Sequence, residues 1–365
     1  MTPARTDIEF VFIQLGEDLP SHLFQNLILV HQMFPLTRIN LVTSKRVVIG
    51  SDIADFVSQT EYESSPELDK LLNVKSRNLS FRNGFWRFSL ERLFAIAYLH
   101  EKRPDKSLLH IESDVLLLQG FPLENFTSVE KIAWMSVDSK KDIASLMFFP
   151  DVAASQIFLD DLVAFVTNAQ SPTDMTALNH LRLENPNKYC LLPTWNRELP
   201  KLHSNLNTES LTESVFGAGI FDAAGIGMWL TGFDPRNSYG FVNYFATKDL
   251  RNAEFFVDPS AYTLEFSEDG TLFYRNGPSY IQVYNLHIHS KSMRLFSINR
   301  IEELSRLTRL SNRGRPHREF FPQVLAGLIM SNFREGTLLA FLFYSPPFKI
   351  LRLAYGLTKK FARGL

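Results

Sequence analysis

The segment Leu108-Leu109-His110-Ile111-Glu112-Ser113-Asp114-Val115-Leu116-Leu117-Leu118 is the most informative part of this sequence. It is an apolar run typical of a β-strand, and it is interrupted by two carboxylates, Glu112 and Asp114, that flank one small residue. Side chains two positions apart on an extended chain point to the same side, so both acids can face one site. Because an unpaired charge is costly at the end of a buried strand, the two carboxylates need a partner.

The residues before this segment predict the beginning of a parallel sheet. Residues 8–15 form a short apolar run closed by Gly16, residues 23–33 have helical spacing, and residues 38–43 form a second β-like run. Parallel neighbours need a crossover connection, which is usually a helix. Residues 80–100 then predict a long helix directly before the acidic segment.

The residues after it continue the alternation of strands and helices. Further strands are predicted at residues 132–137, 145–149, 257–266, 271–274 and 280–289. A helix is predicted over residues 153–167, short elements over residues 168–213, and a hairpin at Glu268-Asp269-Gly270. Antiparallel strands late in a mainly parallel order imply a mixed sheet. The predicted class is therefore α/β, with a mixed, mainly parallel sheet flanked by helices.

Two interpretations fit the acid pair. Carboxylate oxygens suit Mg²⁺ or Mn²⁺, and these ions usually also bind substrate phosphates. In this interpretation Asp114 and Glu112 are metal ligands. In the alternative, the two acids close the strand end and form salt bridges with arginines of the preceding helix, such as Arg87 or Arg92.

A second polar segment is Asn285-Leu286-His287-Ile288-His289-Ser290-Lys291. On a strand, His287, His289 and Lys291 would share one face while the apolar residues between them enter the core. Imidazole can complete a metal shell, and lysine can neutralise a diphosphate as a compact charge. His289 is the preferred ligand because Ser290 and Lys291 follow it directly, and His287 is the second choice. The alternative is a half-exposed polar strand face.

The apolar strand, Glu112-Ser113-Asp114 and the apolar continuation resemble the acid-x-acid motif of nucleotide-sugar-dependent glycosyltransferases of the GT-A fold. The resemblance covers about residues 8–295 and includes the late His and Lys. It implies a Rossmann-type, GT-A-like sheet in which Asp114 binds a Mn²⁺ or Mg²⁺ ion that bridges the diphosphate of the donor. Glu112, which would contact the ribose or the metal shell, stands where the family more commonly has Asp.

The resemblance also implies site residues outside these two segments. Residues 221–237, FDAAGIGMWLTGFDPRN, are similar to a D-x-x-x-x-G-x-x-L-x-G-x-D-P-R-N stretch of some bacterial and viral GT-A proteins. Asp222 and Asp174, an acid that opens a helix as the acceptor-side acid of many such enzymes does, are the catalytic candidates. Capping of a helix N-terminus explains both acids equally well. The donor site is assigned Arg87, from a helix that also offers Arg82 and Arg92, together with Glu112, Asp114 and Lys291.

The resemblance predicts a catalytic domain over residues 1–300, with a nucleotide-sugar half over about 1–140 and an acceptor half over about 141–300. Residues 301–365 are expected to form a helical C-terminal extension that ends in a basic amphipathic tail over residues 345–365. The tail contains Lys349, Arg352, Lys359, Lys360 and Arg363 but no acid. At 100° per residue these charges form one stripe beside a wide apolar face, which suits an anionic membrane surface. The alternative is a helix packed on the catalytic domain or on a partner.

Composition narrows the class of protein. Of the 365 residues, 45% are hydrophobic, and 38 Lys and Arg stand against 39 Asp and Glu. Without a basic field, binding to nucleic acid is not expected. One cysteine, Cys190, and the absence of a signal-peptide pattern in residues 1–16 predict a reducing cytoplasm, and no apolar run approaches the ~20 residues of a membrane span.

The leading hypothesis is a metal-dependent glycosyltransferase that moves a sugar from a nucleoside diphosphate sugar to a glycan or glycolipid acceptor. It would act in surface glycan or glycolipid synthesis, as a peripheral protein on the inner face of the membrane. The alternative is a non-catalytic, membrane-associated sugar-nucleotide-binding or scaffold protein of the same fold. A sugar-phosphate nucleotidyltransferase is disfavoured, because no Gly-rich basic loop follows residues 8–15.

Overall fold

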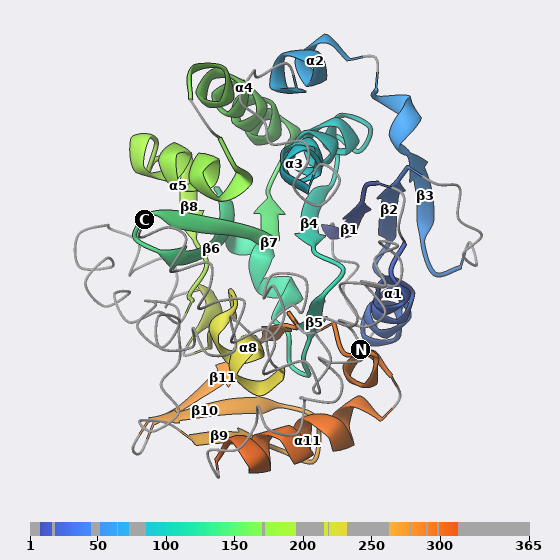
Figure 1. Cartoon of the computed structure of the whole chain (residues 1–365), viewed down its shortest axis with the longest axis vertical. Coiled ribbons are helices and arrows are strands. Elements are labelled where there is room, and N and C mark those ends of the chain that lie inside the picture. Colours follow the sequence, from blue (N-terminus) through green and yellow to red (C-terminus); the bar gives the residue numbers. More distant parts are fainter. Residues whose placement is uncertain are drawn as a thin grey trace, which may run out of the picture.

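The protein is an α/β structure, described here from a computed structural model. The structure describes residues 8–16, 19–44, 52–63, 65–72, 85–169, 172–194, 215–217, 219–231, 263–276, 279–289, 291–297 and 299–312. A mixed, mainly parallel sheet lies at the centre with helices on both faces (Figure 1), so the predicted class is confirmed.

The central sheet has seven strands in the order β3-β2-β1-β4-β7-β6-β8. The strands are β1 (Ile8–Gln14), β2 (Ile39–Thr43), β3 (Asp55–Ser58), β4 (Ser107–Ile111), β6 (Ile132–Asp138), β7 (Lys141–Phe149) and β8 (Tyr189–Leu191). β7 runs antiparallel to both of its neighbours, β4 and β6, whereas the other pairs in the sheet are parallel. The prediction of a mixed sheet is confirmed, but its antiparallel strand is β7 and not one of the late strands.

Helices cover the two faces of this sheet because their apolar stripes match the alternating faces of the strands. The helices are α1 (Ser21–Met33), α2 (Pro66–Leu72), α3 (Phe85–Glu101), α4 (Val152–Asn168), α5 (Asp174–Glu184), α8 (Gly225–Thr231) and α11 (Arg300–Ser311), with 3₁₀ turns η1 (Gln59–Glu61), η3 (Leu123–Ser128) and η5 (Met293–Phe296). α1 packs its buried Leu23 and Leu27 against one face, in a cluster with Phe10 and Leu109. α3, α4 and α5 cover the other face.

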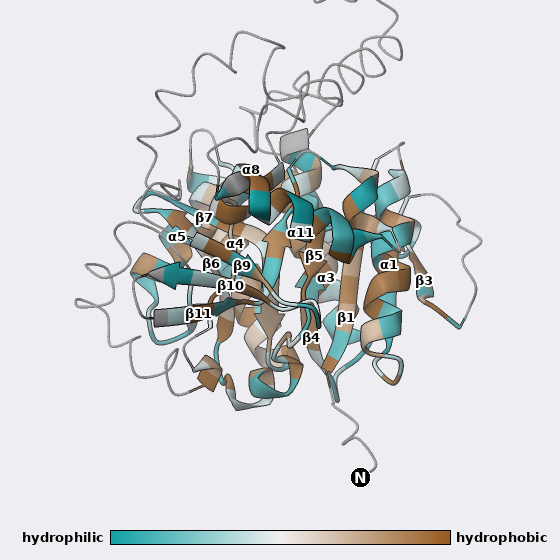
Figure 2. Ribbon diagram, turned by 90° about the horizontal axis from the view of Figure 1, so that it is seen from below, coloured by the Kyte–Doolittle hydropathy of each residue, from teal (hydrophilic) through white to brown (hydrophobic). Residues whose placement is uncertain are grey.

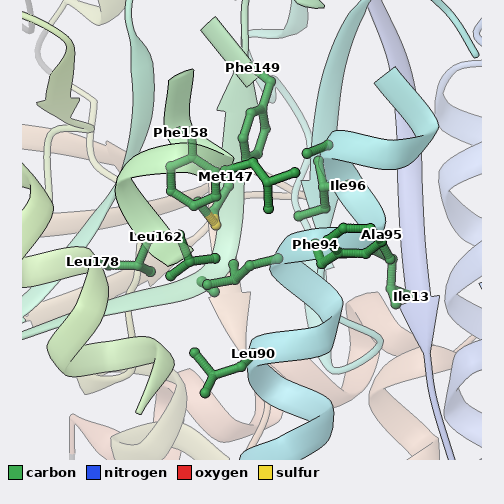
Figure 3. Close-up of a cluster of buried hydrophobic side chains, with 14 of the residues drawn as sticks. Ile13, Leu90, Phe94, Ala95, Ile96, Met147, Phe149, Phe158, Leu162 and Leu178 are labelled. Atoms are coloured by element: carbon green, nitrogen blue, oxygen red, sulfur yellow. The ribbon is translucent and has the colours of Figure 1, made fainter. Parts of the chain in front are cut away.

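The core under α3, α4 and α5 is dominated by large apolar side chains (Figure 3). Leu90 of α3, Phe158 of α4 and Leu178 of α5 belong to one cluster with Met147 and Phe149 of β7, and each of these side chains is buried. Burial of one such side chain contributes about 1.5–3 kcal/mol. This cluster joins α3, α4 and α5, and α3 and α5 carry residues of the site described below.

The late part of the chain forms a third layer and does not join the central sheet. Strands β9 (Thr263–Phe266), β10 (Leu272–Asn276) and β11 (Ser279–Val283) make an antiparallel sheet, and β12 (Asn285–His287) pairs antiparallel with β5 (Val115–Leu117). The predicted hairpin before β10 is confirmed, with Gly270 at a φ of 95°, which favours glycine. In Figure 2, which views the molecule from below, α8, α11 and strands β9 to β11 lie in front of the central sheet.

The predicted strand over residues 280–289 is divided between two sheets. β11 pairs with β10, whereas β12 pairs with β5, and Tyr284 lies between them with its hydroxyl group donating to the Phe216 carbonyl at 2.7 Å. The apolar side chains of β5 and β12 then pack with α8 and α11 in one cluster, which includes Leu116, Leu286 and Ile226. This layer brings the late histidine segment to the acidic segment.

The domain limits at residues 140 and 300 stay predictions. β7, which follows residue 140, lies between β4 and β6, so the two expected halves share one sheet. Residues 313–365, including the basic tail, lie outside the described residues. Among the helices that the structure describes, none is long and apolar enough to cross a membrane.

Candidate metal centre

The two acids lie in a turn where β4 leaves the central sheet and β5 enters the third layer. The amide of Glu112 still donates to the Ser145 carbonyl of β7 at 2.9 Å, and the amide of Val115 then donates back to the Glu112 carbonyl at 3.0 Å. Asn26, a buried residue of α1, donates its side-chain amide to the Ser113 carbonyl at 3.2 Å and to the Val115 carbonyl at 2.7 Å. The carboxylates therefore project from a backbone that is held on three sides.

The pairing register of β5 and β12 places His287 beside the acids. His287 is opposite Val115, and the next amide, that of Ile288, donates to the Asp114 carbonyl at 2.8 Å. His287 Nε2 lies 3.5 Å from Glu112 Oε2 and 3.6 Å from Asp114 Oδ1. One ligand atom from each of these three residues lies within 4.8 Å of the other two, which is the spacing that a single metal ion requires.

The imidazole of His287 is oriented by a backbone carbonyl. His287 Nδ1 lies 2.7 Å from the Ala223 carbonyl oxygen, which can only accept, so Nδ1 carries the proton. Nε2 is therefore the nitrogen that faces the carboxylates. A hydrogen bond of this kind from the far nitrogen is typical of histidines that bind metals.

The expected alternation from His287 to Lys291 ends at His287. β12 stops there, the amide of His289 bonds back to the His287 carbonyl at 3.0 Å, and Lys291 has a φ of 53°. The ring of His289 stacks on that of His287, with centroids 4.0 Å apart. His287, the second choice from the sequence, is thus the histidine grouped with the acids, because the turn after it carries His289 out of the strand face.

Lys291 returns to the site after this turn. Its Nζ donates to Asp114 Oδ2 at 2.9 Å, so Asp114 faces a lysine on one oxygen and His287 on the other. This contact places Lys291 beside the acid pair. Its role toward a diphosphate stays a prediction.

Arg92 of α3 is the arginine that reaches the acid pair. One of its terminal nitrogens contacts Glu112 Oε1, and the other donates to Asp174 Oδ2 at 3.0 Å. Arg87, the arginine assigned to the donor site, instead lies 3.7 Å from Glu91 in its own helix and is half-exposed. Arg82 lies outside the described residues. The salt bridge between Glu112 and the preceding helix is therefore present, at Arg92.

Asp174 begins α5, as predicted, but it is not the residue that caps the helix. Thr173 caps α5 by accepting from the Thr176 amide at 3.1 Å, which leaves the carboxylate of Asp174 for Arg92. Asp174 is 5% exposed, and burial raises its pKa although Arg92 opposes the rise. Arg92 therefore lies between Asp174 and Glu112 and pairs with both.

Asp222 is fully engaged with backbone amides. Its Oδ1 accepts from the Ile226 amide at 2.9 Å, and its Oδ2 accepts from the amides of Gly227 at 2.7 Å and His287 at 3.1 Å. Burial raises its pKa, and these three amides oppose the rise. The carboxylate of Asp222 thus accepts amides of the first turn of α8, although Asp222 is not the residue directly before Gly225, and it also accepts an amide from the histidine segment.

The charges of the site shift one another strongly. Burial tends to raise the pKa of Asp114, but Lys291 and His287 outweigh it and hold that pKa well below its ordinary value. Burial tends to lower the pKa of His287, but Asp114 and Glu112 outweigh it and raise the pKa to about 9. In the absence of a metal, His287 is therefore protonated at neutral pH and acts as a counter-ion for the acids.

The donor set fits a divalent cation. Carboxylate oxygens from Glu112 and Asp114 suit Mg²⁺ or Mn²⁺, and the imidazole nitrogen favours Mn²⁺ and later transition metals over Mg²⁺. A metal would displace the proton of His287, since only the neutral ring can be a ligand.

Three polar residues that support the site were not identified from the sequence. They are Asn26, His22, whose Nε2 is 3.3 Å from Ser113 Oγ, and Asn285, whose side chain bonds both backbone groups of Asp222. Asn26 follows Leu23 at the spacing of one helix face, so it is a polar residue on an apolar stripe. This position could have indicated a buried polar contact. Asn285 precedes His287 by two positions and so shares its strand face.

Several solved structures that are similar to this chain are glycosyltransferases. No protein-family model and no curated protein matches the sequence. Among solved structures, the chain is similar to the PaToxG glycosyltransferase, with 11% identity and a TM-score of 0.35 over 58% of this chain and 78% of that chain. It is also similar to the galactosyltransferase LgtC in complex with donor and acceptor sugar analogs, with 10% identity and a TM-score of 0.35 over 57% and 83% of the two chains.

A third similar structure is a glycosyltransferase involved in the glycosylation of the major capsid of PBCV-1. Its identity is 12%, its TM-score is 0.31, and the match covers 50% of this chain and 80% of that chain. All three matched proteins are glycosyltransferases of low identity to this chain. A function for this chain therefore has to be argued from its own site.

Proposed function

We propose that this protein is a metal-dependent glycosyltransferase that moves a sugar from a nucleoside diphosphate sugar to an acceptor. The observation that carries the proposal is the convergence of Glu112, Asp114 and His287, whose ligand atoms lie within 4.8 Å of one another at the end of a central strand. Ligands of open α/β sheets bind at the carboxyl ends of the strands. The resemblance of the acid-x-acid segment to the GT-A family supports the same function.

Each residue of the site has a role in this proposal. Glu112, Asp114 and His287 hold Mn²⁺ or Mg²⁺, which when bound would stabilise the negative charge of the leaving diphosphate. Lys291 already reaches Asp114, and its flexible stem allows it to contact a phosphate oxygen as well. Arg92 pairs with both Glu112 and Asp174, and Asp174 remains the candidate for a role toward the acceptor.

Asp114→Asn tests the metal assignment. The substitution keeps the size of the side chain and removes its charge, so Mn²⁺-dependent binding of the donor should be lost. In a thermal-shift screen of UDP-, GDP- and CDP-sugars with and without Mn²⁺, the wild type should be stabilised by the correct donor only with metal. A ligand at 100 times its Kd adds about 2.7 kcal/mol.

Asp161→Asn is the matched control. Asp161 also accepts from a lysine at 2.9 Å, from Lys188, and it lies in α4, outside the metal-binding group. This variant should respond to donor and Mn²⁺ like the wild type. If Asp114→Asn does so too, the assignment of the acid pair is wrong.

The competing functions differ in turnover. A non-catalytic sugar-nucleotide-binding protein of this fold would show the same Mn²⁺-dependent stabilisation but no release of nucleoside diphosphate in the presence of acceptors or water. A nucleotidyltransferase would release pyrophosphate from a nucleoside triphosphate. Three protein ligands would leave metal positions open for the donor in either case, so release of nucleoside diphosphate is what separates the enzyme from a binding protein.

The place of action is a further part of the proposal. We infer from the basic, acid-free sequence of residues 345–365 that the protein attaches to an anionic membrane surface on its cytoplasmic side and acts on a glycan or glycolipid acceptor.

A further inference from the structure

Asp222 forms hydrogen bonds with α8 and with β12, the strand that ends in His287. Its carboxylate is 2% exposed and accepts three backbone amides, those of Ile226, Gly227 and His287. Its own backbone amide donates to Asn285 Oδ1 at 3.0 Å, and its carbonyl accepts from Asn285 Nδ2 at 3.0 Å. Asn285 and His287 are the two ends of β12. Asp222 therefore ties β12 to the beginning of α8.

Two residues that follow Asp222, Ala223 and Gly227, also contact the histidine. The carbonyl of Ala223 accepts from His287 Nδ1 and so fixes the ring. Gly227 lies so close to β12 that a Cβ atom there would be 2.1 Å from the His287 carbonyl oxygen and 2.8 Å from Asp222 Oδ2. Contact at these distances excludes any larger residue without a shift of backbone. The Asp and Gly of the motif thus both lie against the backbone of the same histidine.

This arrangement leaves Asp222 little capacity for proton transfer. A carboxylate that accepts three amides in a buried position is committed to those bonds, and a general base must instead reach the proton that it abstracts. Within the described part of the chain, these hydrogen bonds of Asp222 go to α8 or to β12. The geometry therefore separates Asp222 from Asp174 and Glu112, which face Arg92.

We propose that Asp222 is a positioning residue that fixes His287 for metal binding, and that it takes no part in acid–base chemistry. The inference rests on the proposed metal-dependent function and assigns a role within that same site. Residues that orient metal-binding histidines typically change metal affinity by 10–100-fold when they are replaced.

The test is titration of the full-length protein with Mn²⁺ alone, followed by electron paramagnetic resonance. Asp222→Ala removes all three acceptor bonds and should weaken Mn²⁺ binding by 10–100-fold. Asp222→Asn can turn its amide oxygen toward Gly227 and His287, although it loses the bond from Ile226. It should bind Mn²⁺ within a few-fold of the wild type, and its transfer activity should follow that affinity. The matched control is Asp151→Ala, which removes an Asp cap from α4, where Asp151 accepts from the Ala154 amide at 2.8 Å. Its Mn²⁺ affinity should not change.

A double-mutant cycle shows whether the effect passes through the histidine. In a His287→Ala background, Asp222→Ala should have no further effect on Mn²⁺ affinity, whereas general damage to the fold would add to it. Circular dichroism checks folding, and Asp222→Ser, whose shorter side chain also cannot span to β12, replaces Asp222→Ala if that variant does not fold.

Nuclear magnetic resonance of the histidine side chains tests the proposal without any metal. Asp222→Ala should move the ring resonances of His287 and leave those of His100 and His110 in place, so this result stands even if the wild type binds no Mn²⁺ and the proposed function fails. Unchanged His287 resonances with wild-type Mn²⁺ affinity would overturn the proposal. So would a loss of transfer activity in Asp222→Asn with intact Mn²⁺ binding, since that pattern identifies a catalytic acid or base.

Discussion

At the scale of single residues, the site is neutralised by its own side chains before any ligand binds. Glu112 contacts Arg92, Asp114 contacts Lys291, and His287 lies between the two acids. A divalent ion has to replace the proton on Nε2 of His287, because the single lone pair of this nitrogen binds either a proton or a metal ion. Metal binding and protonation of this histidine are therefore competing reactions.

This competition predicts a dependence on pH. The pKa of His287 is about 9 in the folded, metal-free protein and about 6.5 when unfolded, so its charge stabilises the fold fully below pH ~6.5. As pH rises from ~6.5 through 9, the metal-free protein should lose stability on the order of 1–3 kcal/mol, while Mn²⁺ affinity should increase. Urea denaturation and Mn²⁺ titration across this range measure the two trends. In His287→Asn both should flatten, and an unchanged pH profile in that variant would contradict the assignment.

At the scale of elements, α5 depends on a buried polar network near its C-terminal end. Asp142 of β7, which is fully buried, accepts from Trp134 Nε1 at 2.9 Å, from Asn179 at 3.3 Å and from Arg182 Nε at 2.7 Å. The other end of α5 carries Asp174, which meets Arg92. The Asp142 network thus fixes the helix that presents Asp174 to the site.

Loss of one partner in this network should be severe. Arg182→Met keeps the length of the side chain but leaves Asp142 charged and buried, which should lower the free energy of unfolding by about 3–5 kcal/mol. Arg275→Met is the matched control, because Arg275 pairs with Glu265 at 3.2 Å on an exposed surface, where about 0–1 kcal/mol is expected. Guanidinium denaturation compares the two. An equal decrease in the free energy of unfolding in both variants would contradict the prediction that the buried pair of Asp142 and Arg182 contributes more than the exposed pair.

At the scale of the whole molecule, the site lies where separate layers meet. The acids come from the end of a central strand, Arg92 and Asp174 from helices on one face, and His287 and Lys291 from the third layer. Residues 114 and 291 are far apart along the chain, so the site forms only when the third layer has packed on β5.

The basic tail leads to a prediction about the whole chain. Truncation after Tyr344 removes residues 345–365 and should release the protein from vesicles that contain anionic lipid, because the charges and the apolar face are lost together. Donor and Mn²⁺ binding should persist in the truncated protein. Higher salt should weaken attachment of the full-length chain, since charges are screened beyond ~8 Å at physiological ionic strength. Neutral vesicles are the control, and equal binding of both forms to anionic vesicles would refute a role for the tail.

Local pattern was sufficient for much of the fold and for half of the site. Period-two and helical spacing predicted β1, α1, β2, α3, β6 and α4 with small shifts at their ends, because burial of apolar side chains forces these periods on the chain. The acid pair was identifiable for a related reason: charges that interrupt an apolar strand are costly, so their presence indicates a partner.

Tertiary structure alone decided which residues those acids meet. The sequence favoured His289 and left both Arg87 and Arg92 open as partners of the acids, whereas the structure places His287 and Arg92 beside them. The register of β5 against β12 places His287 beside the acids, and the packing of α3 on the sheet turns Arg92 inward. The close approach of Gly227 to β12 allows Asp222 to form hydrogen bonds with the histidine segment. Register and close packing depend on pairs of residues that are distant in the chain, and no single-segment periodicity carries that information.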